Sequence, residues 1–425
     1  MNKRPASTLD VSKIKTAAFV IEEDILRHNL SVLKYVKDKT GAKMFQALKT
    51  WATWPLFPIV REYLDGTEVS SLNEARLGYD EFNHEVHMYA PAYKDKEFAD
   101  VLKYCSTIIF NSFDQWKKFK PQVEAFVKKT GQQRECGLRL NPEYTGHDEP
   151  REIDKDAISP GEHGGLWTPC APGSRLGVRP NEFKQALAED PSVLDGISGF
   201  HFHIFFDKTF PKLKEAVGVV EKNFEPYFKG RKWINFGGGQ KITDDEYDVE
   251  GLITLINDFK KKHGVDVHLE PGAAIVKYAG SLVTSVLDVV YRDDVPYKIA
   301  ILDMSFNAHM PDFLLAPDMD NPVRDAVITR EPDAHKGEHM YQLAGGTCVT
   351  GDKLSHYHIF KELLKPGDKV IIEDGIQYNM VQCTMFNGVQ HPSIVLWKDL
   401  PRDEASGNAQ TIREFTYQDF RARMG

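Results

Sequence analysis

The chain has 425 residues, of which 41% are hydrophobic and 27% charged, a composition typical of ordinary globular proteins. This length is enough for two or three domains, or for one large barrel with a smaller domain. The composition excludes disordered, collagen-like and low-complexity classes. The net charge of −9 argues against a nucleic-acid partner, and it is compatible with a cationic ligand or with a solvated acidic surface.

Targeting signals and the cysteine pattern further restrict the class of protein to which the chain can belong. No run approaches the roughly 18 apolar residues that a membrane span needs, and residues 1–15 lack the apolar core of a signal peptide. We therefore expect a cytoplasmic protein without a membrane partner. The five cysteines contain no CxxC pair, so neither a disulfide framework nor a zinc knuckle is indicated. We expect no metal, and a functional cysteine would act alone.

Short apolar runs alternate with amphipathic stretches between about residues 16 and 275. Repeated alternation of strand and helix predicts parallel βαβ units, and about eight of them are typical of a (β/α)₈ barrel. A doubly wound sheet would show the same alternation. The helical stretches include residues 55–64 and 115–130. The runs interpreted as strands are 16–21, 43–49, 86–90, 107–111, 136–141, 197–206, 232–239 and 265–272.

Polar residues favour the barrel over the open sheet. Five features lie at or just after the predicted carboxyl ends of different strands: Lys49, Arg139, His203, the glycine run Gly237–Gly239 and Glu270. A barrel gathers these ends around one mouth. We therefore expect a TIM-type (β/α)₈ barrel with a functional site at its mouth.

The sequence pattern changes after residue 280, where runs of β-branched residues follow one another without regular helices between them. This pattern predicts a β-rich second domain. We expect a barrel over residues 22–278 and a β-rich domain over 279–425, and we expect the N-terminal segment 1–21 to be part of the β-rich domain. The polar stretch 146–166 contains Gly and Pro and predicts a loop, which we expect to be mobile or to cover the barrel mouth.

Two features of the predicted mouth suggest binding chemistry. A lysine that ends an apolar strand, as Lys49 does, either extends to solvent at the rim or is desolvated with a lowered pKa, as a Schiff-base lysine requires. Three consecutive glycines, Gly237–Gly239, let backbone N–H groups converge on an anion, although a tight turn explains them equally well. The run lacks the spacing of a nucleotide-binding fingerprint.

Histidine, glutamate and cysteine positions add further candidates. His201 and His203 alternate on one strand and so face the same side, which suits a metal pair or an aromatic platform, and we favour one functional and one packed histidine. Glu270 ends a later strand, where it is a buried carboxylate at the mouth or a turn cap. Cys348 lies among small residues, four positions before Asp352, in a setting that leaves a thiol accessible.

Ten segments, in order across nearly the whole chain, carry a family resemblance. Together they resemble the fold type III pyridoxal-phosphate decarboxylases, whose fold is alanine racemase-like, and within them the carboxynorspermidine (carboxyspermidine) decarboxylase branch. The SSLNE, PCAP-SRLG, CxxGD and FNGVQHPSI segments favour this branch over ornithine or diaminopimelate decarboxylases. The matching segments are FQALKTW, GTEVSSLNEARLG, NPEY, PCAPGSRLGV, GFHFH, NFGGGQKIT, LEPG, LDMSFNAHMPD, GGTCVTGD and YNMVQCTMFNGVQHPSI.

The resemblance implies a role for each matching residue. Lys49 would form the Schiff base with pyridoxal 5'-phosphate, and His203 would stack on its pyridine ring. Gly237, Gly238, Gly239 and Tyr378 would hold the phosphate, while Glu270 would face the pyridine nitrogen and lie beside the substrate. Cys348 would supply a proton to the substrate carbon, and Asp303, Asp312 and Asp352 would face the substrate amines. The family also implies a homodimer in which the Cys348 segment reaches the partner's site.

The implied activity is PLP-dependent decarboxylation of carboxynorspermidine, carboxyspermidine or both, yielding norspermidine or spermidine and CO₂ in polyamine biosynthesis. Three alternatives stay open: decarboxylation of another diamino acid such as diaminopimelate or ornithine, a non-catalytic PLP-binding relative, and metal-dependent hydrolysis using His201 and His203. Departures from the family pattern bear on the substrate. They are Ala273 after EPG, Gln240, Gln377, the long loop 146–166 and the segment 313–320 after HMPD.

Overall fold

The structure is a computed structural model that describes residues 3–144, 170, 173–204, 209–312, 322–399 and 408–425. The expected loop at 146–166 and the divergent segment 313–320 lie outside the described residues. The chain divides into two compact units. One spans Leu30–Ile275, and the other combines Asn2–Asn29 with Val276–Gly425.

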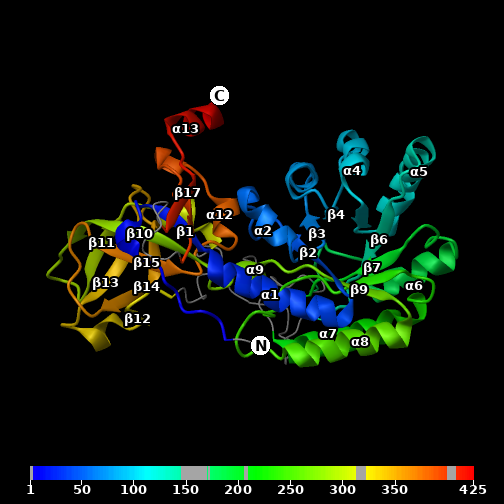
Figure 1. Cartoon of the computed structure of the whole chain (residues 1–425), viewed down its shortest axis with the longest axis horizontal. Helices are drawn as coiled ribbons and strands as arrows, with labels where there is room; N and C mark the ends of the chain where they lie inside the picture. The colour runs from blue at the N-terminus through cyan, green and yellow to red at the C-terminus, as the bar shows by residue number, and fades with distance from the viewer. Residues whose placement is uncertain (1–2, 145–169, 171–172, 205–208, 313–321, 400–407) are drawn as a thin grey trace. The chain divides into compact units, whose positions relative to one another are not determined.

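The first unit is built on a closed parallel barrel of eight strands (Figure 1). Each strand pairs in parallel with the next, and β2 pairs with β9 to close the ring. The expected barrel is therefore confirmed. The strands are β2 (Lys43–Ala47), β3 (Gly66–Val69), β4 (Glu85–Tyr89), β5 (Thr107–Phe110), β6 (Glu135–Arg139), β7 (Gly199–His201), β8 (Trp233–Asn235) and β9 (Asp266–Leu269).

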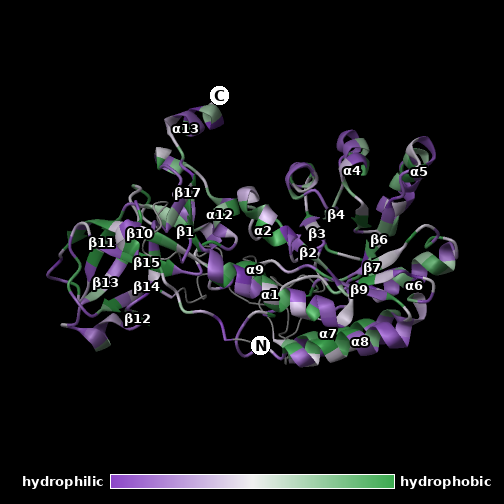
Figure 2. Ribbon diagram, viewed as in Figure 1, coloured by the Kyte–Doolittle hydropathy of each residue, from purple (hydrophilic) through white to green (hydrophobic). Residues whose placement is uncertain are grey.

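Amphipathic helices follow the strands. In α8 the buried residues recur at helical spacing, from Leu252 to Ile256 and Phe259, while three consecutive lysines lie near its end. Hydrophobic and hydrophilic residues therefore share both α7 and α8 (Figure 2). The helices are α1 (Glu23–Thr40), α2 (Phe57–Arg61), α3 (Leu72–Leu77) with the π-helix η3 (Gly78–Phe82), α4 (Phe98–Tyr104), α5 (Phe113–Thr130), α6 (Pro180–Glu189), α7 (Phe210–Phe224), α8 (Val249–His263) and α9 (Ala273–Val276).

Trp233 packs across the neighbouring strands of the barrel. A Cβ atom on Gly137 of β6 would lie 2.5 Å from its ring, and one on Gly199 of β7 would lie 2.2 Å from it. The indole N–H donates to Glu135 at 2.7 Å. A large side chain therefore fits only because two adjacent strands present bare backbone to it.

The second unit contains a nine-stranded mixed sheet in the order β12-β14-β13-β11-β10-β1-β16-β17, with β15 also paired to β10. The expected β-rich domain is therefore confirmed as part of the fold. Its elements are β1 (Ala18–Glu22), β10 (Gly280–Val290), β11 (Lys298–Leu302), β12 (Ala326–Thr329), β13 (Met340–Ala344), β14 (Lys353–Phe360), β15 (Lys369–Glu373), β16 (Ser393–Trp397), β17 (Ala409–Arg413) and the helices α10 (Phe306–His309), α12 (Asn379–Gln382) and α13 (Tyr417–Met424).

The eight runs of the alternating pattern do not coincide with the eight barrel strands. The run 16–21 forms β1, which lies in the nine-stranded sheet and pairs antiparallel with β10 and parallel with β16, within the segment 1–21 that we expected to join the β-rich domain. The barrel instead contains β3, which the pattern missed. This strand has four residues and carries Glu68 among its buried side chains, so no hydrophobic alternation reveals it.

The contact between Gly199 and Trp233 makes a testable prediction about stability. Gly199→Ala places a methyl group against both the indole ring and the carbonyl oxygen of Trp233, so we expect unfolding free energy to fall by about 3 kcal/mol. Gly218→Ala in α7 is the matched control, because nothing lies within 4 Å of its new methyl group. Urea unfolding checks both variants, and equal stabilities would contradict the packing argument.

Candidate active site

Glu270 follows β9 and forms the centre of a buried polar cluster. Its Oε1 accepts a hydrogen bond from Asn235 Nδ2 at 2.7 Å, and its Oε2 lies 3.1 Å from His201 Nε2. Burial alone would raise the pKa of Glu270, but the hydrogen bond and charge of His201, together with Lys49, hold this pKa well below its ordinary value. The cluster therefore presents an ionised carboxylate inside the protein.

His201 is the packed histidine of the pair. Burial lowers the pKa of His201, and its Nε2–H donates to the carboxylate of Glu270. Its Nδ1 has no hydrogen-bond partner among the described residues. Tyr89 stacks on the ring at a centroid distance of 5.5 Å. These contacts fix the ring and with it the position of Glu270.

His203 and the glycine turn form the second part of the cluster. The N–H of Gly238 donates to His203 Nδ1 at 3.0 Å, and the N–H of Gly237 donates to Asn235 Oδ1 at 2.8 Å. Burial, reinforced by Lys49 and Arg139, lowers the pKa of His203 well below its ordinary value. The imidazole is therefore neutral, with its Nδ1 held by the turn.

The glycines are required by close backbone approach. Gly237 adopts a φ of 66°, in the left-handed region that disfavours side chains. A Cβ on Gly238 would lie 2.2 Å from the carbonyl oxygen of Glu270. The glycine run therefore joins the ends of β8 and β9 tightly. Because two of its N–H groups already donate within the protein, phosphate binding by the run stays a prediction.

Lys49 lies just beyond β2, and its side chain is 40% exposed. Its Nζ is 3.9 Å from Oε2 of Glu68, whose side chain is only 2% exposed. Lys49 also acts electrostatically on His203 and Glu270. The structure thus brings together Lys49, His203, Glu270 and the glycine turn, as the sequence predicted for one barrel mouth.

Arg139 and Asn111 support this cluster from neighbouring strands. The guanidinium of Arg139 lies 4.4 Å from the ring centroid of Tyr89 and donates to the backbone carbonyl of His203 at 3.2 Å. Asn111 Oδ1 accepts from the Tyr89 hydroxyl and from the N–H of Gly177, both at 2.7 Å. The second of these bonds ties the SRLG segment to the barrel.

The sheet unit holds the remaining candidates, with Cys348 at an exposed position. The side-chain amide of Asn387 donates to the sulfur of Cys348 at 3.2 Å. Asp352 is buried and accepts from the N–H of Asn307 at 3.1 Å and from both the N–H and the hydroxyl of Thr347. Asp352 therefore fixes the turn that carries the cysteine.

The three other sheet-unit candidates have different surroundings. Asp303 Oδ1 accepts from the Thr284 hydroxyl at 2.5 Å and from the N–H of Ser285 at 2.8 Å. Asp312 is half-buried, and burial raises its pKa. Tyr378 has a φ of 59° and immediately precedes α12. Substrate and cofactor contacts by these residues stay predictions.

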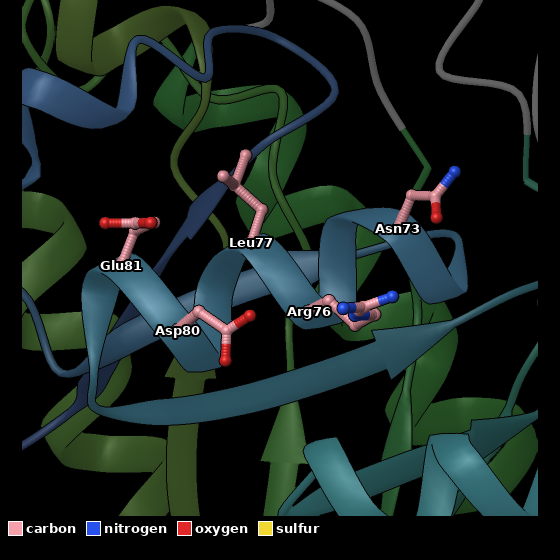
Figure 3. Close-up of a pocket in the computed structure, with 5 residues that line it drawn as sticks. All are labelled: Asn73, Arg76, Leu77, Asp80 and Glu81. Carbon is pink, nitrogen blue, oxygen red and sulfur yellow. The ribbon is translucent and has the colours of Figure 1, made fainter.

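Other features of the described residues carry less chemistry. In the described part of the chain, no group of three or more His, Cys, Asp or Glu side chains could hold a metal ion, and no helix is long and apolar enough to cross a membrane. A shallow hollow of about 250 Å³ lies on α3 and η3, where its lining side chains project from successive helical turns (Figure 3). These side chains are Asn73, Arg76, Leu77, Asp80 and Glu81.

Comparison with protein families decides the class. Residues 29–376 match the family described as "Pyridoxal-dependent decarboxylase, C-terminal sheet domain". The chain belongs to the pyridoxal-dependent decarboxylases. The predicted family, enzyme class and cofactor, pyridoxal 5'-phosphate, are thereby confirmed.

Individual relatives of this decarboxylase are similar over nearly their whole length. A Campylobacter jejuni protein named carboxynorspermidine/carboxyspermidine decarboxylase is 36% identical, covering 97% of this chain and 99% of the relative. A Synechocystis carboxyaminopropylagmatine decarboxylase is 35% identical, covering 98% and 97%. The crystal structure of C. jejuni carboxynorspermidine decarboxylase complexed with norspermidine has a TM-score of 0.80 at 35% identity, covering 96% of this chain and 100% of that one.

The buried cluster of this decarboxylase fits the cofactor by its donor chemistry. An amine at the rim suits an aldehyde, and an ionised, desolvated carboxylate suits a protonated ring nitrogen. The neutral imidazole of His203 presents a flat face that is compatible with stacking. The functional groups therefore match the aldehyde, the ring nitrogen and the ring face of the cofactor.

Sequence reasoning missed several residues of the cluster. Asn235 was not singled out, although it precedes the glycine run by two positions and orients both Gly237 and Glu270. Glu68 lies within the resembling segment GTEVSSLNEARLG, but no role was assigned to it. Asn387 lies in the FNG segment, whose proximity to Cys348 becomes visible only in the folded sheet unit.

Buried histidines predict how stability depends on pH. Burial, with His87 and Lys43, lowers the pKa of His268 well below its ordinary value, while the unfolded chain takes up a proton near 6.5. The unfolded state therefore binds more protons below pH 6.5, and stability present above that pH is lost as the pH falls, by about 1.4 kcal/mol per unit for one such group.

His268→Phe tests this link while preserving a ring beside Trp233, on which His268 stacks at 5.2 Å. We expect the melting temperature of the variant to fall less steeply than that of the natural protein between pH 6.5 and 5. Melting curves recorded across this range measure the two slopes. Above pH 7 the two slopes should agree, and equal slopes at acid pH would show that His268 does not contribute.

Proposed function

We propose that this protein removes the α-carboxylate of carboxynorspermidine or carboxyspermidine, producing norspermidine or spermidine and CO₂ in polyamine biosynthesis. The observation that carries the proposal is the cluster that Lys49 forms with the buried His203 and Glu270 at the barrel mouth. The near full-length similarity to the C. jejuni decarboxylase supports the choice of substrate.

Pyridoxal phosphate, when bound, accepts the electron pair that is released as CO₂ leaves. Lys49 would hold the cofactor covalently and give way to the substrate amine. Glu270 would keep a proton on the ring nitrogen, because its hydrogen bonds from Asn235 and His201 maintain it as a carboxylate. His203 would support the ring face, and Gly237–Gly239 with Tyr378 would bind the phosphate.

Cys348 would deliver a proton to the substrate carbon after CO₂ leaves. It is exposed and accepts a hydrogen bond from Asn387, which orients the sulfur. Asp303, Asp312 and Asp352 would attract the ammonium groups of a long cationic substrate. Asp303 and Asp352 already accept hydrogen bonds within the sheet unit, so they would contribute negative potential while holding their own segments in place.

A second substrate is favoured by the Synechocystis relative, whose identity of 35% nearly equals that of the C. jejuni protein. Carboxyaminopropylagmatine shares the carboxylated end with the other candidates and carries a guanidinium at the far end. A guanidinium is planar and suits two-point binding by a carboxylate, whereas an ammonium is a point charge. The substrate choice therefore depends on the groups at the distal end.

Parallel turnover assays test the function. The cofactor-loaded protein would be offered carboxynorspermidine, carboxyspermidine, carboxyaminopropylagmatine, meso-diaminopimelate and ornithine, with CO₂ and amine release as readouts. We expect turnover of the carboxylated triamines only. Turnover confined to the guanidinium compound would favour the second substrate, and activity on diaminopimelate or ornithine alone would overturn both. No turnover of any of the five substrates would indicate a protein that binds the cofactor without catalysing decarboxylation.

We also propose that the enzyme is a cytoplasmic homodimer with shared active sites. Support comes from an apolar side chain beside the thiol: Phe386, next to the Asn387 that contacts Cys348, is 45% exposed. Aromatic side chains are enriched in surfaces that bind another protein chain. The partner would be a second copy of this chain.

Mixing two inactive variants tests the shared site. Lys49→Ala removes the cofactor-linked amine, and Cys348→Ala should slow turnover by about 10²–10⁴-fold through loss of the proton donor. If each site uses Lys49 of one chain and Cys348 of the other, half of the dimers in an equal mixture have one intact site, which restores about a quarter of full activity.

Cys383→Ala is the matched control for the thiol. Burial raises the pKa of Cys383 to about 12, so this thiol is unsuited to proton delivery near neutral pH, and we expect the variant to remain active. Full activity of Cys348→Ala alone would remove Cys348 from the mechanism. Low activity of both variants with no recovery on mixing would place each lysine and cysteine pair within one chain.

A further inference from the structure

Glu68 is a buried acid whose carboxyl group lies within 4 Å of the Lys49 amine. It belongs to the short strand β3, and its side chain is 2% exposed. Its Oε2 lies 3.9 Å from the Nζ of Lys49 and accepts no hydrogen bond from the described residues. Such an oxygen lacks the compensation that buried carboxylates normally receive, so it is available to a proton or to a donor that moves.

Charges of both signs act on Glu68. Lys49 and Arg139 favour its ionised form, whereas the carboxylates of Glu270 and Glu74 oppose it. Burial then dominates and raises the pKa of Glu68 to about 8. The carboxyl therefore changes its protonation state close to the pH at which an enzyme of this class operates.

We propose that Glu68 exchanges a proton with Lys49 each time the lysine joins or leaves the cofactor. This inference rests on the cofactor-linking role of Lys49 in the proposed function. In the forward direction, the Lys49 ammonium gives a proton to the Glu68 carboxylate, and the N–H electron pair stays on nitrogen as the lone pair of a neutral, nucleophilic amine. In the reverse direction, the Glu68 carboxyl returns the proton to the released amine.

Proton transfer between Lys49 and Glu68 leaves the net charge of the pair unchanged. The transfer therefore brings no additional charge into the protein interior. An ammonium and a carboxylate together carry no net charge, and neither do an amine and a carboxylic acid. The ionic arrangement loses part of its advantage here, because the Glu68 carboxylate is 2% exposed and has lost its hydration, although Lys49 is 40% exposed. The distance of 3.9 Å exceeds a hydrogen bond, but the flexible four-carbon stem of Lys49 can shorten it.

Glu74 is the nearest comparison and is less suited to this role. It lies at the start of α3, and its Oε2 accepts a hydrogen bond from the N–H of Ser70 at 2.7 Å. Burial raises the pKa of Glu74 as well. Because Oε2 of Glu74 already accepts a hydrogen bond at the start of α3, Glu74 serves as the matched control in an experiment on Glu68.

Infrared spectroscopy of the cofactor-loaded enzyme tests the protonation of Glu68 directly. We expect a C=O stretching band of a protonated carboxyl at neutral pH that fades as the pH rises past about 8. The band should be absent from Glu68→Gln and retained in Glu74→Gln. A band that survives in Glu68→Gln, or that is absent from the natural enzyme, would overturn the proposal.

A second readout measures the exchange itself. Hydroxylamine removes the cofactor from Lys49, and absorbance follows the rate without any turnover of substrate. Loss of the proton partner in Glu68→Gln should slow this release by about 10²-fold or more and abolish its dependence on pH between 6 and 9. Glu68→Asp, which retains the carboxyl, should recover part of the rate. An unchanged rate and pH profile in Glu68→Gln would overturn the proposal.

The role of Lys49 itself is tested separately. Borohydride reduction followed by peptide mapping identifies the residue that carries the cofactor. Attachment at another lysine would refute both the proposed role of Lys49 and the inference about Glu68. Attachment at Lys49, combined with unchanged hydroxylamine kinetics in Glu68→Gln, would leave the proposed function standing and refute the inference about Glu68 alone.

Discussion

The desolvated carboxylate of Glu270 is the constraint on which the rest of the site depends. A buried carboxylate is costly unless its oxygens are satisfied, and here Asn235 and His201 each satisfy one oxygen. Asn235 in turn holds the Gly237 turn, and that turn holds His203. Charge compensation for a single carboxylate thus fixes the ends of β7, β8 and β9 in one arrangement.

The two carboxyl groups of this cluster, Glu270 and Glu68, differ in their protonation because they receive different hydrogen bonds. Glu270 receives directed hydrogen bonds and stays ionised, whereas Oε2 of Glu68 receives none from the described residues and its carboxyl is protonated more readily. Lys49 acts on both of them. One barrel mouth therefore holds a permanent negative charge beside a carboxyl whose charge can change, and this pairing suits chemistry in which an amine is repeatedly attached and released.

Much of this arrangement was accessible from the sequence because parallel barrels impose a rule on strand ends. Lys49, His203, Gly237–Gly239 and Glu270 each follow an apolar run, and the barrel gathers them. The rule did not identify β3, because Glu68 is buried there and no hydrophobic run marks the strand in the sequence. The alternating pattern also does not distinguish β1 from the barrel strands, because the partners of β1, β10 and β16, come from distant parts of the chain. Hydrogen bonds such as that from Asn387 to Cys348 depend on tertiary approach, which no spacing encodes.

The packing of Trp233 has a consequence for how such barrels diverge. The indole occupies space that side chains at positions 137 and 199 would otherwise fill. A lineage that replaced the tryptophan by a smaller residue would open a cavity, and one that enlarged either glycine first would create a clash. Positions 137, 199 and 233 are therefore coupled in evolution. Substitutions at these positions should occur together, or they should pass through an intermediate of reduced stability.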